Sequence, residues 1–358
     1  MSQRKSALWK TVWTLLVAAA SLAGGSTVYA EPPIAELPSA RKAATADPND
    51  PNLTPTTPRQ QDKDDKTDDR ADKSAPAPKT AEQRAAEKKA AEKFLRIVRD
   101  ADGEPQSMQT SIVSYKPKDG DRKGLVVDLI GAVHVGDGAY YDKLNKAFTE
   151  YDVVLYELVA PEGTKIPKGG RTEGSGHPVS AIQQGLKNIL DLEFQLEKVD
   201  YTKKNFVHAD MSPEEFAKSM DDRGESFLKM FFQMMGASIA QQAGKKGNAS
   251  DAEILLALLS PDRSFKLKRV MAQQFENLGG SMNALEGPKG STIISERNRK
   301  ALEVLKKEID GGKKKIAIFY GAGHLPDMET RLAQDFQLNP GEVKWIDAWD
   351  LRQKKSGR

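Results

Sequence analysis

The sequence of 358 residues contains no cysteine. This absence excludes disulfides, thiolate metal sites, iron–sulfur clusters, a cysteine nucleophile and a lipidated N-terminal cysteine. An excess of one charge is also lacking. The first 30 residues carry only Arg4, Lys5 and Lys10 as charges, and without these three the 54 Lys and Arg fall to 51, against 51 Asp and Glu. This balance gives no support for a nucleic-acid partner.

Long hydrophobic runs are scarce, and the main one lies at the N-terminus. Thr11 to Ala23 is apolar, follows the three basic residues, and precedes a Val-Tyr-Ala triplet that ends at Ala30. This order is typical of a secretory signal peptide, and the run is short for a membrane span. We predict a signal peptide over residues 1–30 and an exported protein, periplasmic or secreted. The alternative is an uncleaved anchor, which would be the chain's only membrane contact.

Residues 31–80 lack aromatic side chains and hold 9 of the 19 prolines, along with the charge block Asp62 to Lys66. Such a segment buries too little apolar surface to offset its conformational entropy, so we predict a disordered linker rich in proline and charge. Residues 81–103 begin with a run rich in Ala, Glu, Lys and Arg. This run predicts a solvated helix whose last turns, around Phe94 to Val98, dock on the folded part.

The remaining chain, residues 104–352, predicts a single folded domain. An apolar run at Leu125–Ile130 predicts a buried strand, Gly138–Glu150 has apolar residues at helical spacing, and Asp152–Leu158 predicts a second strand. This β-α-β order indicates a parallel pair of strands joined by a right-handed crossover.

The C-terminal part predicts a strand at Lys315–Tyr320, a helix from Pro326 to Phe336 and a final strand at Val343–Trp349. A mostly helical insertion, about residues 178–310, separates it from the first part. Within the insertion, Asn205–His208 resembles a strand, and a serine N-cap with Pro and Glu behind it predicts a helix start at Ser212. The fold class predicted is α/β, with a split mixed sheet and a large helical insertion.

Ionisable residues follow three of the predicted strands. His134 ends the segment that starts at Gly131, His324 ends the similar segment that starts at Gly321, and Glu157 lies at the end of the second strand. Ligands of open α/β sheets bind at the carboxyl ends of strands, so we expect these three side chains to converge. A carboxylate in an apolar strand is costly to bury unless it is paired or metal-bound. The alternative is two structural histidines and an exposed glutamate.

Two G-x-x-H motifs, a glutamate after the first, and the segment Glu296-Arg297-Asn298 occur here in the order found in the TraB/PrgY/GumN family. The chain resembles this family over about residues 124–350, including the strand before the glutamate, Tyr151 to Leu158. The family is related to the TIKI proteases and more distantly to ChaN-like and erythromycin-esterase proteins. The resemblance implies a ChaN/TIKI-like fold and an active site of His134, Glu157, Arg297 and His324.

The resemblance leaves several chemistries open. TIKI relatives are metal-dependent peptidases, which would make His134, His324 and Glu157 ligands of zinc, manganese or cobalt, with Glu157 and Arg297 as catalytic residues. Erythromycin-esterase relatives activate water without a metal, ChaN-like relatives bind haem and iron, and PrgY-like members act on peptide pheromones. We predict an exported, metal-assisted hydrolase that cleaves a peptide or small ester. The alternative is a non-catalytic protein of the same fold that binds haem, metal or a signalling peptide.

Two points qualify the family pattern. Many TraB members have an Asp-Arg pair after the strand in the middle segment, whereas this chain has His208 and Asp210 there and no arginine. Asp210 is therefore a further residue that could reach the site, and His208 could substitute for part of the missing function. The alternative for Arg297 is a surface position on a charged helix, because Lys300, Lys306 and Lys307 lie nearby.

Overall fold

A computed structural model describes residues 80–118, 122–170, 190–225, 260, 262–278 and 290–353. The predicted signal peptide and all but the last residue of the predicted linker lie outside these ranges, as does much of the predicted insertion. All described residues belong to one compact unit of the chain. None of the helices in these ranges is both long and apolar enough to span a membrane.

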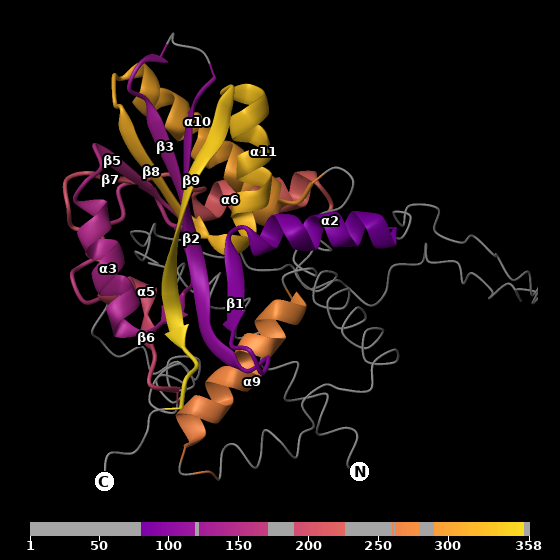
Figure 1. Ribbon diagram of the computed structural model, residues 1–358. Coiled ribbons are helices and arrows are strands. Elements are labelled where there is room, and N and C mark those ends of the chain that lie inside the picture. Colours follow the sequence, from indigo (N-terminus) through magenta and orange to yellow (C-terminus); the bar gives the residue numbers. More distant parts are fainter. Residues whose placement is uncertain are drawn as a thin grey trace, which may run out of the picture. The chain divides into compact units, whose positions relative to one another are not determined.

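A mixed, seven-stranded sheet organises the described residues (Figure 1). Its order is β1-β2-β3-β8-β5-β7, and β9 pairs with β2 outside this path. The four strands β3, β8, β5 and β7 are parallel to one another. The strands β1, β3 and β9 each pair antiparallel with β2. The strands are β1 (Leu95–Arg99), β2 (Pro105–Pro117), β3 (Val126–Ala132), β5 (Val153–Tyr156), β7 (Phe206–His208), β8 (Lys315–Gly321) and β9 (Leu338–Asp350). A separate two-stranded sheet joins β4 (Val135–Gly136) to β6 (Glu193–Phe194).

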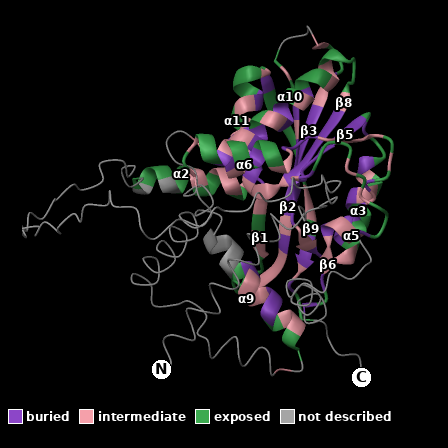
Figure 2. Ribbon diagram, turned by 180° about the vertical axis from the view of Figure 1, so that it is seen from behind, coloured by how far each residue is buried: buried purple, intermediate pink, exposed green. Residues whose placement is uncertain are grey.

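Helices cover both faces of the parallel strands. Odd-numbered residues of β3, such as Val127 and Leu129, pack with α10 and α11, while Ile130 and Ala132 pack on the face that α3 covers. This alternation follows from the two-residue period of a strand, and it buries β3, β5 and β8 on both sides (Figure 2). The helices are α2 (Ala81–Glu92), α3 (Gly138–Phe148), α5 (Gln195–Lys198), α6 (Pro213–Asp222), α9 (Arg263–Leu278), α10 (Arg297–Asp310) and α11 (Leu325–Asp335), with single turns η4 (Thr292–Glu296) and η5 (Ala322–His324).

The order of the parallel strands corrects one expectation. The strands β3 and β5 are parallel, as predicted, but they do not pair with each other, because β8 lies between them and pairs with both. The run Ile316–Tyr320 is apolar and buried throughout, which suits a central strand enclosed by both helical layers. The segment after β8 is therefore brought between the segments that follow β3 and β5.

The predicted solvated helix over residues 81–103 is wrong in its second half. The helix α2 begins with a capping box formed by Thr80 and Gln83 and ends at Glu92. The following residues form β1, which pairs with β2 from Leu95 opposite Thr110 onward. The β-branched Ile97 and Val98 favour a strand there. Phe94 is fully buried, so the folded part begins before residue 104, where the sequence placed its start.

The other elements compare closely with the predictions. The strands β3, β5, β7 and β8 and the helices α3 and α11 lie within a few residues of their predicted bounds, and the capping box at Ser212 is confirmed. The sequence did not predict β2, and the described parts of the insertion contain β6 and β7 as well as helices. The fold is α/β with a mixed sheet, as predicted.

Candidate functional site

The four parallel strands end in polar residues at one edge of the sheet. His134 lies two residues beyond β3, Glu157 directly follows β5, Asp210 lies two residues beyond β7, and His324 lies three residues beyond β8. The start of α10 adds two more side chains at this edge. We refer to these residues together as the sheet-edge cluster: His134, Glu157, Asp210, Arg297, Asn298 and His324.

The three groups singled out from the sequence meet beside Gly321. A Cβ atom at this position would lie 3.2 Å from Oε2 of Glu157, 3.6 Å from Cδ2 of His324 and 4.0 Å from Nε2 of His134. The Gly321 N–H also donates to Glu157 Oε2 at 2.6 Å. The predicted convergence of two imidazoles and one carboxylate from three strands is therefore confirmed. The absence of a side chain at Gly321 leaves the space in which they approach each other.

Arg297 joins the two carboxylates of the cluster. Its Nη2 atom donates to Glu157 Oε1 at 2.7 Å and to Asp210 Oδ2 at 2.6 Å, and its Nε atom donates to Asp210 Oδ1 at 2.9 Å. The residue is only 2% exposed, so these bonds are shielded from water. Burial by itself lowers the pKa of Arg297, but Asp210 and Glu157 outweigh that effect and hold the pKa above its usual range. The guanidinium is therefore permanently charged and fixed in place.

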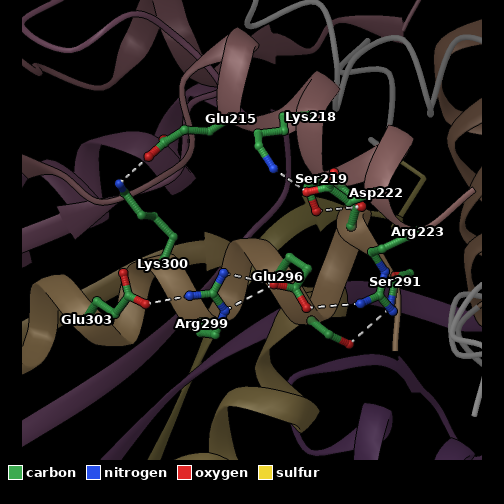
Figure 3. Close-up of polar contacts among 12 residues, drawn as sticks. Glu215, Lys218, Ser219, Asp222, Arg223, Ser291, Glu296, Arg299, Lys300 and Glu303 are labelled. Atoms are coloured by element: carbon green, nitrogen blue, oxygen red, sulfur yellow. Dashed lines mark hydrogen bonds and ion pairs between the residues drawn. The ribbon is translucent and has the colours of Figure 1, made fainter. Parts of the chain in front are cut away.

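The neighbours of Arg297 on the same helix behave differently. Arg299 bonds to Glu296 and Glu303, and Lys300 bonds to Glu215 on α6, all at the outer side of α10 (Figure 3). The Arg299 side chain is 55% exposed. The alternative that placed Arg297 at the surface of a charged helix is therefore wrong. Arg299 lies at that surface, whereas Arg297 points toward the sheet.

Glu157 is buried and ionised. Burial raises the pKa of its carboxyl, but the Arg297 cation and the Gly321 N–H lower it more, and the result is a pKa well below the usual range. The alternative in which Glu157 is simply exposed at an edge is wrong, because the residue is 7% exposed. Its charge is compensated by a partner that lies far away in the sequence.

His324 is held by Asn298. Its Nδ1 atom lies 2.7 Å from Asn298 Oδ1, while the Asn298 amide nitrogen donates to the His324 carbonyl at 3.0 Å and to Asp327 Oδ2 at 2.8 Å. Since the amide nitrogen is used by two acceptors, Oδ1 must face the ring, and Nδ1 carries the hydrogen. Burial lowers the pKa of His324 to about 4 against the opposing effect of Glu157. The imidazole is therefore neutral at pH 7, with its lone pair on Nε2.

The other two described histidines differ in role. His134 is half-buried, and its carbonyl accepts a hydrogen bond from the backbone of Gln195 at 2.9 Å, which ties it to the start of α5. His208 is the last residue of β7, and its Nε2 atom lies 2.5 Å from the Leu158 carbonyl. That contact occupies Nε2 of His208, and it is Asp210, two residues further along the chain, that reaches Arg297.

The cluster matches a divalent metal in the type of its donors but not fully in their arrangement. Nε2 of His324 and Oε1 of Glu157 are 3.5 Å apart, close to the spacing of about 3.4 Å between two ligands of tetrahedral zinc. Over the ranges that the structure describes, however, no three His, Asp or Glu side chains are grouped to hold an ion. Both Glu157 oxygens already accept hydrogen bonds from Arg297 and Gly321. As arranged, the predicted ligands His134, His324 and Glu157 do not form a complete metal site.

Asp210 and Asn298 are the residues that sequence reasoning used least. Asp210 carries the same signal as Glu157, since it is an acidic residue just beyond a short apolar strand. Asn298 directly follows Arg297 in the Glu-Arg-Asn segment, but no role for it follows from sequence alone.

Comparisons with protein-family models, with curated proteins and with solved structures found no match for this chain.

Proposed function

We propose that this chain is a hydrolase that cleaves a peptide or ester bond with a water molecule activated between His324 and Glu157. One observation carries the proposal: the Nε2 lone pair of His324 faces Glu157 Oε1 across 3.5 Å. Two hydrogen-bond acceptors repel each other at this distance unless a donor bridges them. A water molecule can donate one hydrogen to each, and such a water is held at an activating base.

In the proposed reaction, His324 Nε2 takes a proton from this water while Nδ1–H stays bonded to Asn298. The resulting imidazolium is stabilised by the neighbouring Glu157 carboxylate. The hydroxide attacks the carbonyl carbon of the substrate, and the imidazolium then returns the proton to the leaving nitrogen or oxygen. Arg297 is bound to both carboxylates, so we assign it to holding Glu157 ionised and in place. We assign the donation to the developing oxyanion to His134, whose Nε2 atom lies on the same side of Gly321 as the acceptor groups.

A metal-assisted form of this hydrolase is the alternative that the family resemblance favours. His134, His324 and Glu157 would hold a zinc, manganese or cobalt ion, which would supply a bound water of lowered pKa. Elemental analysis of protein purified without a histidine tag separates the two forms. Stoichiometric metal, and activity that a chelator removes, would replace the metal-free form with the metal-assisted one.

The proposal is tested by hydrolysis of peptide and ester libraries with His324→Gln, His134→Gln and Glu157→Gln variants. We expect turnover to fall by about 100-fold or more while the fold is kept, because the changes remove the general base, the imidazole assigned to the oxyanion, and the charge that stabilises the imidazolium of the base, respectively. His208→Gln is the matched control, since this histidine lies at the same edge but binds a backbone carbonyl. If the three variants hydrolyse substrates as well as the parent chain does, the site is wrong.

Absence of turnover with tight, stoichiometric binding of haem, a metal or a peptide would favour the non-catalytic alternative. It would leave the cluster as a binding site rather than an active site. Loss of thermal stability alone in the three variants, without any change in ligand binding, would mean that the motif residues are structural.

Export and family membership belong to the same proposal. The basic, apolar and small-residue order of residues 1–30 supports cleavage after Ala30, and the mass of the mature protein tests it, since a chain that starts at Glu31 is expected. The arrangement of both G-x-x-H segments, Glu157 and Arg297 around one sheet edge supports a TraB/TIKI-like fold.

A further inference from the structure

The side-chain amide of Asn298 contacts both the ring and the backbone of His324. Its Oδ1 atom lies 2.7 Å from the ring Nδ1, and its Nδ2 atom donates to the His324 carbonyl at 3.0 Å. A group that binds the ring and the carbonyl of one residue fixes the ring relative to its own backbone. Tyr320 also contacts the ring edge-on, with centroids 5.3 Å apart.

The orientation of the Asn298 amide is set by a second layer. Its remaining hydrogen goes to Asp327 Oδ2 at 2.8 Å, and that oxygen also accepts from Arg331 Nε at 2.7 Å. Rotating the amide by half a turn would place Oδ1 against two acceptors, the His324 carbonyl and the Asp327 carboxylate. Because Asn298 is fully buried, water cannot relieve such contacts. The chain Arg331–Asp327–Asn298 therefore allows one amide orientation.

We propose that Asn298 is a positioning residue that commits His324 to the Nδ1–H tautomer and aims its Nε2 lone pair at Glu157. The inference deepens the proposed function and rests on it for its catalytic consequence, but the tautomer itself is independent of any reaction. Arg297 and Asn298 are consecutive residues in the first turn of α10. Arg297 binds the Glu157 carboxylate and Asn298 binds the His324 imidazole, so this one turn positions both hydrogen-bond acceptors, which we call the acceptor pair. Partners that orient a metal-bound histidine through its second nitrogen contribute about 10- to 100-fold to activity or affinity, and we expect an effect of that size here.

The experiment uses the full-length chain with ¹⁵N-labelled histidine, treated with a chelator, at pH 7. Long-range proton–nitrogen correlation spectra report which ring nitrogen of each of the four histidines is protonated. We expect the Nδ1–H pattern for His324 in the parent chain. In Asn298→Leu we expect the pattern to become mixed or Nε2–H, with turnover reduced by about 10- to 100-fold. Arg299→Leu, one position further along, is the control and should change neither readout.

The Nε2–H pattern in the parent chain, or an unchanged Nδ1–H pattern with full turnover in Asn298→Leu, would overturn the proposal. Should Asn298→Leu not fold, Asp327→Ala takes its place, because it removes the acceptor that selects the amide orientation, and a mixed pattern is expected. If the parent chain hydrolyses no substrate but shows the predicted tautomer, the proposed function fails and the positioning role stands.

Discussion

The Nη2 atom of Arg297 lies 2.7 Å from Oε1 of Glu157, although the two residues are 140 positions apart in the chain. Both side chains are almost fully buried, and the same nitrogen also binds Asp210. One buried cation therefore holds two buried anions together, and the excess negative charge lies beside a neutral imidazole. This arrangement decides both the stability of the sheet edge and the properties of the acceptor pair, His324 and Glu157.

Arg297→Met should be strongly destabilising. The change leaves the carboxylates of Glu157 and Asp210 buried without a cation, which costs about 3–5 kcal/mol in the free energy of unfolding. Urea denaturation measures this loss. Arg299→Met is the matched control on the same helix, because its ion pairs are exposed and contribute less than about 1 kcal/mol. Equal effects of the two changes would contradict the role assigned to Arg297.

Asp210→Asn should reduce activity more than it reduces stability. The amide keeps the shape of the side chain but removes one of the two charges that fix Arg297, so the guanidinium can shift relative to Glu157. We expect hydrolysis to fall by about 10-fold or more, by analogy with the loss caused by altering a group that orients a metal ligand. Asp222→Asn, which affects only an exposed pair with Lys218, is the control. Full activity of Asp210→Asn would show that Glu157 alone holds Arg297.

The stability of the folded chain should fall between pH 7 and pH 5. Burial lowers the pKa of His324 to about 4, whereas an unfolded chain has a histidine pKa of about 6.5. Between these values the unfolded chain binds a proton that the folded chain does not, so the stability contributed by neutral His324 is complete above pH 6.5 and is lost as the pH falls towards 4.

The expected loss from His324 is about 2 kcal/mol between pH 7 and pH 5. Urea unfolding of the parent chain and of His324→Gln at both pH values isolates this contribution, because the other histidines are common to both proteins. The His324→Gln chain should lose correspondingly less stability. The same pH dependence in both chains would mean that His324 is not a neutral buried imidazole.

Gly321→Ala should impair activity with little effect on folding. The added methyl group would lie 3.2 Å from Glu157 Oε2, so the carboxylate has to shift by a few tenths of an ångström and with it the position of the activated water. We expect activity to fall by about 10-fold, since misplacement of reacting groups by about 1 Å costs about 100-fold. Gly138→Ala at the start of α3 is the control, as its nearest neighbour would be 3.9 Å away. A fully active Gly321→Ala chain would show that the space beside Gly321 is not critical.

Much of the local structure could be predicted from sequence because its causes are local. The apolar runs of β3 and β8, the helical spacing of α3 and the capping box of α6 each involve residues close together in the chain. The errors arose where partners are distant. The run at Leu95–Arg99 comes shortly after the helix α2, whose residues favour helix, and only its pairing with β2 makes it a strand.

The sequence by itself determined the kind of residues at the candidate site and the strand ends on which His134, Glu157 and His324 lie. These features follow from the pattern of apolar runs and the residues that close them. Only the tertiary structure decided that β8 lies between β3 and β5, that Arg297 points inward while Arg299 points outward, and that Asn298 binds His324. The physical reason is that strand order and buried ion pairs depend on contacts between residues far apart in the chain, which no local pattern encodes.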